Sequence, residues 1–275
     1  MSGYDERPAI DVMRELENRV ALVTGAASGI GRATARRMAE HGATVILVDR
    51  TADALPSALE DLPAGAHRTV TLDVTDEAGW IDVARTIDDE IGHLDILVNN
   101  AGFGTFRSIA DTTLDHWRMV MAVNLDSIFL STKYLLPLLA KSPTGGAIVN
   151  MSSIRGIAGA ANTGAYCAAK GGVRMFTKAT ALECAALGNG VRANSIHPGH
   201  VATPLTAGAH ASEEGQRALL ADTPLGRKAS PDEIADAIVF LAGDGSRSEP
   251  GVDRTVNVLV MPRRPDTATL SANAV

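Results

Sequence analysis

The chain alternates between short, almost purely apolar runs and longer segments with helical periodicity. Apolar runs rich in Val, Ile and Leu occupy residues 19–25, 44–50, 68–74, 94–100, 146–153, 191–199 and 254–261. Polar residues do not alternate with apolar ones in these runs, which is typical of strands that helices cover on both faces. The pattern therefore predicts a seven-stranded parallel sheet.

Helical periodicity fills the gaps between these runs. The predicted helices span residues 30–41, 77–91, 114–140, 164–187 and 231–242. Strands that alternate with helices predict an α/β protein with a Rossmann-like, doubly wound sheet in a single domain. Three segments do not follow the alternation: an N-terminal extension (1–17), a long segment (200–230) expected to contact substrate, and a tail (262–275).

Composition narrows the classes of function. Of 275 residues, 45% are apolar and 21% charged, as in soluble globular proteins. The net charge of −7 and the lack of a Lys/Arg block argue against a nucleic-acid partner. Neither a run of 18 apolar residues nor a secretory signal is visible, so we expect a cytoplasmic protein without a membrane span. Cys167 and Cys184 lack metal-ligand spacing, and neither a metal site nor a disulfide is expected.

A glycine-rich turn, TGAASGIG at residues 24–31, joins the first strand to the first helix. Gly25, Gly29 and Gly31 would allow a tight turn, and the free N–H groups at the helix start would bind a pyrophosphate. The alternative is a glycine-rich turn without a ligand.

The second strand ends at Asp49, at the spacing where a carboxylate meets the ribose hydroxyls of a dinucleotide. Such a carboxylate repels the 2'-phosphate of NADP, and Ser28 offers that phosphate no cation. Arg50 follows directly and is the one residue here suited to hold it. We therefore expect NAD rather than NADP, with a simple strand-end cap as the alternative role of Asp49.

Tyr166 and Lys170 stand four residues apart in TGAYCAAKGGV and would share one face of a helix. A cation favours the phenolate form of tyrosine, whose reference pKa is about 10. Two charges ~4 Å apart at an effective dielectric of ~20 interact by about 4 kcal/mol, or roughly three pKa units. An exposed helical pair would show the same spacing. The polar segments 99–102, 149–153 and 197–199 favour a site, because they end parallel strands at the edge where ligands bind.

With these motifs, the chain resembles the short-chain dehydrogenase/reductase family over residues 17–242, and most closely its NAD-dependent secondary-alcohol and hydroxysteroid dehydrogenases. The resemblance implies a catalytic tetrad. Tyr166 would be the general acid/base, Ser153 would bind the reacting oxygen, and Lys170 would lower the pKa of Tyr166 and bind the nicotinamide ribose. Asn124 would hold a water that links Lys170 to solvent. Ser152 is one position off the family's serine spacing.

The resemblance also implies a cofactor site. Asp73 and Val74 would contact the adenine, Asn100 would lie near the adenosine ribose, and Val201 and Thr203 would hold the nicotinamide amide. The full predicted set is Gly25, Ser28, Gly29, Ile30, Gly31, Asp49, Arg50, Asp73, Val74, Asn100, Ala101, Gly102, Tyr166, Lys170, Pro198, Gly199, Val201 and Thr203.

The substrate is expected to be a secondary alcohol or ketone. The pocket is predicted to contain Phe103, Ile154, Arg155, Ile157, Asn162 and His200. Arg155 would either face an anionic substrate or lie on the pocket rim in water. His197 is interpreted as a packing residue, and Trp80 and Trp117 as core or interface residues. Rival hypotheses are an NADPH-dependent ketoreductase and a non-catalytic nucleotide-binding subunit.

The family resemblance also implies a homo-oligomer, a dimer or tetramer that pairs through helices 114–140 and 164–187. The C-terminal segment departs from the family pattern, because a TG…VDGG segment is absent and SEPGVDRTVNVLVM stands in its place.

Overall fold

Six parallel strands form the central sheet in the described residues (15–204, 223 and 225–246) of the computed structural model. The strands are β1 (Val20–Thr24), β2 (Thr44–Asp49), β3 (Arg68–Thr71), β4 (Ile96–Asn99), β5 (Ala147–Met151) and β6 (Arg192–Ile196). Their order in the sheet is β3-β2-β1-β4-β5-β6. The direction of winding reverses between β1 and β4, which is the position where doubly wound sheets bind ligands.

The sequence prediction of a parallel, doubly wound sheet is confirmed for these six strands. The predicted seventh strand (254–261) and the tail (262–275) lie outside the described residues, as do most of the N-terminal extension and residues 205–222. The third strand is shorter than predicted. It ends at Thr71 because Asp73 turns the chain by accepting hydrogen bonds from the N–H and hydroxyl of Thr75.

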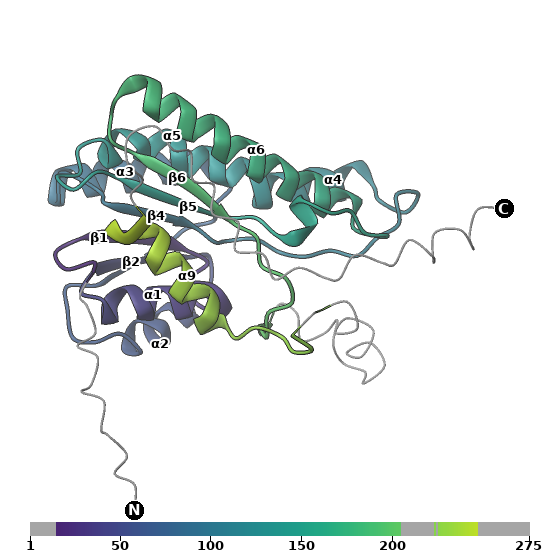
Figure 1. Ribbon diagram of the computed structural model, residues 1–275, viewed down its shortest axis with the longest axis horizontal. Coiled ribbons are helices and arrows are strands. Elements are labelled where there is room, and N and C mark those ends of the chain that lie inside the picture. Colours follow the sequence, from purple (N-terminus) through teal and green to yellow (C-terminus); the bar gives the residue numbers. More distant parts are fainter. Residues whose placement is uncertain (1–14, 205–222, 224, 247–275) are drawn as a thin grey trace, which may run out of the picture.

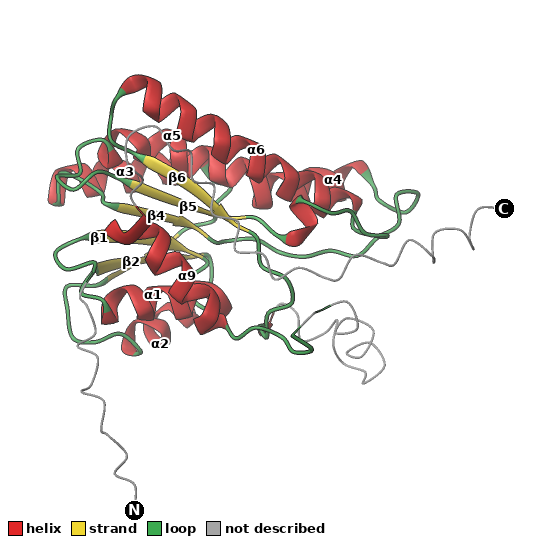
Figure 2. Ribbon diagram, viewed as in Figure 1, coloured by secondary structure: helices red, strands yellow, loops and turns green. Residues whose placement is uncertain are grey.

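Helices cover both faces of the sheet, as Figures 1 and 2 show. α1 (Gly29–Glu40), α2 (Leu55–Glu60) and α9 (Pro231–Ala242) lie on one face; α3 (Glu77–Glu90), α4 (Leu114–Met121), α5 (Ser127–Leu139) and α6 (Gly164–Leu187) lie on the other. The sequence did not predict α2. The predicted helix at 114–140 is in fact α4 and α5 joined by a π-helical turn at Ala122–Asp126.

Alternate side chains of the strands supply two separate cores. Val23 and Val45 point toward α1 and α9 and pack with Met38 and Ile238. Their neighbours Leu22 and Ile46 point the other way and pack with a cluster that includes Trp80, Leu135 and Leu139. Because both faces are buried, the strands carry apolar residues at nearly every position.

Trp80 is a core residue, as predicted, with none of its surface exposed. Its indole N–H donates to the Val74 carbonyl over 2.9 Å, which satisfies the one polar atom of the side chain. Trp117 is 38% exposed on α4 and is therefore not part of the core.

The start of α9 follows the sequence prediction closely. Ser230 accepts from the Glu233 N–H over 3.2 Å, and the Glu233 carboxylate accepts from the Ser230 N–H over 2.8 Å. Pro231 occupies the first helical position, where its missing N–H costs nothing. This capping box stabilises the helix by about 1 kcal/mol.

One described helical stretch, Leu114–Leu139, has the length and mean hydropathy (1.2) of a membrane-crossing helix. Ile128, Leu135 and Leu139 in this stretch are buried in the protein. Packing against the sheet therefore accounts for the apolar character of its α5 part.

The small residues of α6 allow it to approach the π-helical turn and α4. A Cβ on Gly172 would lie 2.7 Å from a side-chain carbon of Leu125. Ala165 and Ala169 pack with Val120 in a third apolar cluster. Gly172, Ala165 and Ala169 therefore contact neighbouring elements of the same chain.

Candidate active site

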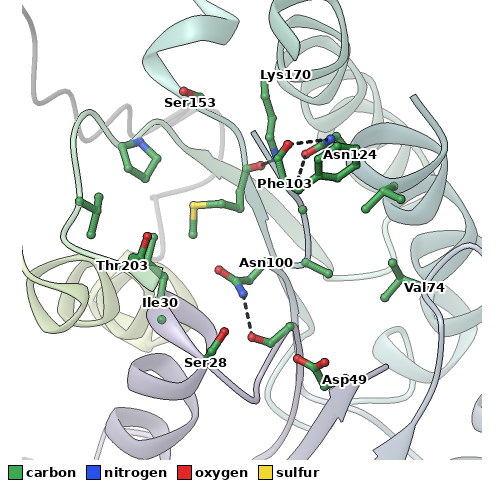
Figure 3. Close-up of a pocket in the computed structure, with 18 of the residues that line it drawn as sticks. Ser28, Ile30, Asp49, Val74, Asn100, Phe103, Asn124, Ser153, Lys170 and Thr203 are labelled. Atoms are coloured by element: carbon green, nitrogen blue, oxygen red, sulfur yellow. Dashed lines mark hydrogen bonds between the residues drawn. The ribbon is translucent and has the colours of Figure 1, made fainter. Parts of the chain in front are cut away.

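A cleft runs along the carboxyl edge of the sheet, from the end of β2 to the start of α6. Figure 3 shows Asp49 and Ser28 at one end, Asn100 in the middle, and Asn124, Lys170 and Ser153 at the other end. All but one of the catalytic and cofactor-binding residues predicted from the sequence line this cleft. Further lining residues, which the sequence did not single out for the site, are Leu72, Val123, Met151, Ser152 and Pro204.

Gly31 is the predicted site residue that does not line the cleft, and its role is steric. A Cβ at this position would lie 2.0 Å from the Gly25 carbonyl oxygen and 2.5 Å from the Asn100 amide nitrogen. Gly25 and Gly29 adopt positive φ angles of +65° and +55°, which glycine tolerates at no steric cost. The three glycines therefore shape the turn, and only two of them face the cleft.

The helix that follows this turn is open to an anion at its start. Ser28, the N-cap of α1, makes no side-chain capping hydrogen bond, and the first turn of the helix holds no acidic residue. The first N–H groups of a helix attract negative charge. The turn is therefore well suited to bind the pyrophosphate of a dinucleotide.

Thr24, which the sequence reading overlooked, links the glycine turn to the end of β4. Its hydroxyl accepts from the N–H groups of Asn100 and Ala101, both over 3.0 Å, and donates to the Val98 carbonyl over 3.3 Å. The Asn100 side-chain amide donates back to the Thr24 carbonyl over 2.9 Å. A threonine that ends a buried strand beside a glycine turn is the sequence signal for this link.

Asp49 holds the turn as well as facing the cleft. Its carboxylate accepts from the Ala27 N–H over 3.1 Å and from the Thr51 N–H over 3.0 Å. Each carboxylate oxygen retains a lone pair for a further donor such as a ribose hydroxyl. Arg50 is exposed on the cleft wall. Asp73, also in the cleft, has a lowered pKa because Thr75 donates two hydrogen bonds to it.

Ser153 and Tyr166 lie beside each other in the lining of the cleft. Ser153 precedes a short 3-10 turn (Ile154–Gly156), and its hydroxyl oxygen accepts from the Arg155 N–H over 3.1 Å. Burial raises the pKa of Tyr166, whereas the hydrogen bond with Ser153 and the nearby charge of Arg155 lower it. Burial is the largest of these effects, so the pKa of Tyr166 lies above its ordinary value and the phenol is protonated at neutral pH.

Lys170 is 3% exposed, and its Nζ donates to the Met151 carbonyl over 2.8 Å. Burial lowers the pKa of this amine to about 8. Its Nζ lies 5.8 Å from the centre of the Tyr166 ring. The sequence interpretation was that Lys170 lowers the pKa of Tyr166. The strongest effect on this pKa is burial, which raises it, and the Ser153 hydroxyl has the largest of the effects that lower it. The Lys170 amine is directed at the Met151 carbonyl instead.

The two neighbouring serines, Ser152 and Ser153, have different hydrogen-bond partners. The Ser152 hydroxyl points to α6 and donates to the Lys170 carbonyl over 2.9 Å. Ser153 is the serine that hydrogen-bonds Tyr166.

Asn124 lies in the π-helical turn with no exposed surface. Its side-chain oxygen accepts from the Phe103 N–H over 3.2 Å, and its amide donates to the carbonyls of Phe103 and Val120, both over 3.1 Å. The side chain thus holds the segment that follows β4, as the dashed lines in Figure 3 show. A Cβ on Gly102 would lie 2.7 Å from Asn124 Oδ1 and 3.3 Å from Lys170 Nζ, so only glycine fits between them.

A buried chain of polar side chains crosses the sheet beneath the site. Ser131 donates to Asn99 over 2.7 Å, Asn99 to Asn150 over 2.8 Å, and Asn150 to Thr177 over 2.9 Å. It connects α5 to α6 through β4 and β5. Sequence reasoning missed it because its members are far apart in the chain.

Of the residues predicted for the substrate pocket, only some line the cleft. Phe103 lines the cleft, but the lining includes none of the other predicted residues: Ile154, Arg155, Ile157, Asn162 and His200. Arg155 is half-buried and close enough to Tyr166 to influence its pKa. Residues 200–204 are anchored to the start of α9, since Ala202 N–H donates to Ala229 and Ala229 N–H donates to His200, both over 2.9 Å.

Comparison with known proteins gives consistent matches over most of the chain. A family model described as "Enoyl-(Acyl carrier protein) reductase" matches residues 25–257. The NADP-dependent (R)-specific alcohol dehydrogenase of Lentilactobacillus kefiri is 38% identical, covering 88% of this chain and 96% of that protein. The cyclopentanol dehydrogenase of Comamonas testosteroni is 40% identical, covering 84% and 92%.

A solved structure agrees with these sequence matches. The putative NAD(P)-dependent gluconate 5-dehydrogenase from Beutenbergia cavernae, with bound NADP, has 35% identity and a TM-score of 0.79. The alignment covers 85% of this chain and 93% of that one. Both the fold and the family of the chain follow from these matches.

Proposed function

The chain belongs to the short-chain dehydrogenase/reductase family and is an oxidoreductase of the secondary-alcohol dehydrogenase type, and on this premise we propose that Tyr166, Ser153 and Lys170 carry out its chemistry with NAD as the preferred cofactor. The observation that carries the proposal is the cleft itself. One end is an open helix start beside a strand-end carboxylate, and the other holds a phenol hydrogen-bonded to a serine.

Tyr166 is the proposed general acid/base. In alcohol oxidation it takes the hydroxyl proton of the substrate; in ketone reduction it donates a proton to the carbonyl oxygen. Hydride transfer to or from the substrate carbon is the chemistry that a bound nicotinamide cofactor supplies. The raised pKa of Tyr166 in the unliganded protein keeps the phenol protonated, which suits it to act first as an acid.

Ser153 is proposed to orient the reacting oxygen. Its oxygen accepts from the Arg155 N–H over 3.1 Å, which holds the hydroxyl beside Tyr166 in the cleft. A donor fixed in this way holds the substrate oxygen near the phenol. Lys170 is proposed to bind the nicotinamide ribose through the hydrogens of its amine that Met151 leaves available.

The cofactor preference rests on Asp49. A carboxylate at this position accepts hydrogen bonds from ribose hydroxyls and repels a 2'-phosphate. Arg50 in the cleft wall favours the second candidate, an NADPH-dependent ketoreductase, and the relative from Lentilactobacillus kefiri is named as NADP-dependent. Comparing kcat/KM with NAD and NADP decides between them. If NAD is the preferred cofactor, Asp49→Ser should shift the ratio of the two kcat/KM values at least tenfold toward NADP. Arg50→Ala should leave kcat/KM with NAD unchanged.

The proposed reaction is tested with a panel of secondary alcohols and ketones that includes cyclopentanol and a hydroxysteroid, followed by the absorbance of NADH. We expect turnover in the wild-type protein and loss of nearly all turnover in Tyr166→Phe, which keeps the ring but lacks the proton-transferring hydroxyl. NAD binding to Tyr166→Phe should remain, as measured by titration calorimetry. Turnover that survives in Tyr166→Phe would refute the assignment of the acid/base.

We also propose that the protein is a homo-oligomer, with a tetramer as the expected state. Apolar side chains on α4, α5 and α6 are unusually exposed, with Met175 at 61% and Leu182 at 65%. Exposed apolar side chains that gather on a few helices are typical of subunit interfaces. Sedimentation equilibrium measures the number of subunits directly, and Leu182→Glu should lower that number.

We propose a cytoplasmic location because both described cysteines, Cys167 and Cys184, are free thiols.

A further inference from the structure

His197, which the sequence reading interpreted as a packing residue, lies directly after β6 with no exposed surface. Both ring nitrogens have partners: Nδ1 is 3.2 Å from the Ser153 carbonyl oxygen, and Nε2 is 2.9 Å from the Ser195 hydroxyl. A carbonyl oxygen only accepts, so Nδ1 must carry the proton. In the neutral ring Nε2 then accepts from Ser195, and the tautomer is fixed.

The surroundings keep this ring neutral. Burial lowers the pKa of His197, and the cations Arg174 and Lys178 of α6 lower it further, against the opposite effect of the Ser153 carbonyl. At neutral pH the ring therefore donates one hydrogen bond to Ser153.

His197 and Pro198 both hydrogen-bond the peptide group that joins Ser153 to Ile154, one at its carbonyl and the other at its N–H. His197 donates to the carbonyl of Ser153, and the next N–H, that of Ile154, donates to the Pro198 carbonyl over 3.1 Å. On the other side of Ser153, the Ser152 N–H donates to the Ile196 carbonyl over 2.9 Å. The backbone around Ser153 is thus fixed by β6, and the direction of the Ser153 side chain depends on it.

We propose that His197 is a positioning residue: its Nδ1–H fixes the Ser153 peptide group, and thereby the Ser153 hydroxyl that orients the reacting oxygen. The proposal rests on the proposed function of Ser153 and Tyr166. Without this donor, the Ser153 carbonyl keeps only the hydrogen bond from the Gly156 N–H (2.9 Å) within its own turn, and the peptide group loses its link to His197. A small displacement of an orienting group slows the chemical step while leaving remote binding contacts in place.

The test uses four variants of the full chain, each checked by thermal melting. His197→Leu removes the donor at similar volume, and His197→Met is a second donor-free variant if the leucine variant does not fold. His197→Asn restores a donor, because its amide nitrogen can occupy the position of Nδ1. Ser195→Ala is the matched control, since it removes a buried hydrogen bond to the same ring but not the one to Ser153.

We expect the donor-free variants to lose about tenfold or more in kcat, with the Kd for NAD unchanged. The primary isotope effect on kcat with a substrate deuterated at the carbinol carbon should rise, because hydride transfer becomes rate-limiting. His197→Asn should recover most of kcat, and Ser195→Ala should retain it. Equal losses in all four variants, or an unchanged isotope effect, would show a merely structural residue and overturn the proposal.

The two proposals fail in different ways. If wild-type turnover disappears in Tyr166→Phe while His197→Leu keeps its full kcat, the positioning role is wrong and the proposed function stands. If Tyr166→Phe retains turnover, the proposed function fails, and the role of His197 fails with it.

Discussion

Replacing Lys170 with methionine should change how the stability of the cofactor-free protein depends on pH. Lys170 is buried, and burial lowers its pKa from 10.5 to about 8. The unfolded chain therefore binds more protons at this site than the folded protein between these two pKa values. Unfolding free energy rises with pH in that window, because the folded state is progressively relieved of a buried charge.

The size of the effect follows from the shift. Below about pH 8 the buried ammonium costs the folded state about 3 kcal/mol, and the cost vanishes near pH 10.5. Between pH 7 and pH 9.5 the wild-type protein should gain about 2 kcal/mol relative to Lys170→Met. The hydrogen bond to Met151 is made by the neutral amine as well, so its loss adds only a constant.

Urea unfolding at fixed protein concentration, followed by tryptophan fluorescence, measures this difference at several pH values. Trp80 is buried in the core and reports on global unfolding. Lys178→Met, on the same helix, controls for the loss of a lysine from α6. A difference between wild type and Lys170→Met that stays flat from pH 7 to pH 9.5 would refute the claim that burial holds this pKa low.

Three further changes probe other parts of the cleft. Gly31→Ala should abolish NAD binding in a calorimetric titration and lower the melting temperature, because its Cβ would lie 2.0 Å from the Gly25 carbonyl oxygen; intact binding would contradict the steric role. Asn150→Leu should cost about 2 kcal/mol in urea unfolding, because it leaves the buried amide nitrogen of Asn99 without its acceptor and removes one of the two hydrogen bonds of the Thr177 hydroxyl; a cost below a few tenths would show that the chain of side chains relaxes. Arg155→Ala should move the pH profile of alcohol oxidation to higher pH, because the Arg155 charge lowers the pKa of Tyr166 and the base must be deprotonated; an unchanged profile, or one moved to lower pH, would exclude this influence.

The fold was predictable because its signal is local and repeated. Each buried parallel strand is a continuous apolar run, and Ser230 and Pro231 mark the start of α9 in the sequence itself. The π-helical turn at Ala122–Asp126 was not predictable, since one widened turn leaves the apolar periodicity of the segment unchanged. The helix α2 is only six residues long, too short for its periodicity to stand out.

The lining of the cleft was predictable where a residue belongs to a local motif, as Asp49, Tyr166 and Lys170 do. It was not predictable where a residue acts through a distant partner. Thr24 serves the site through the N–H groups of Asn100 and Ala101, and His197 through a carbonyl at Ser153. No spacing in the sequence encodes such pairs, because the winding of the sheet, rather than the chain order, brings them together.

The same winding explains how a helix and a strand present Ser153 and Tyr166 as one unit. Two hydrogen bonds of opposite direction join α6 to the end of β5: the Lys170 amine donates to the Met151 carbonyl, and the Ser152 hydroxyl donates to the Lys170 carbonyl. Both bonds lie within one turn of Tyr166 and within two residues of Ser153. Lys170 is therefore a structural link as well as a charged group of the cleft. Making this link requires the amine to be buried, and burial lowers its pKa because it disfavours the charged form.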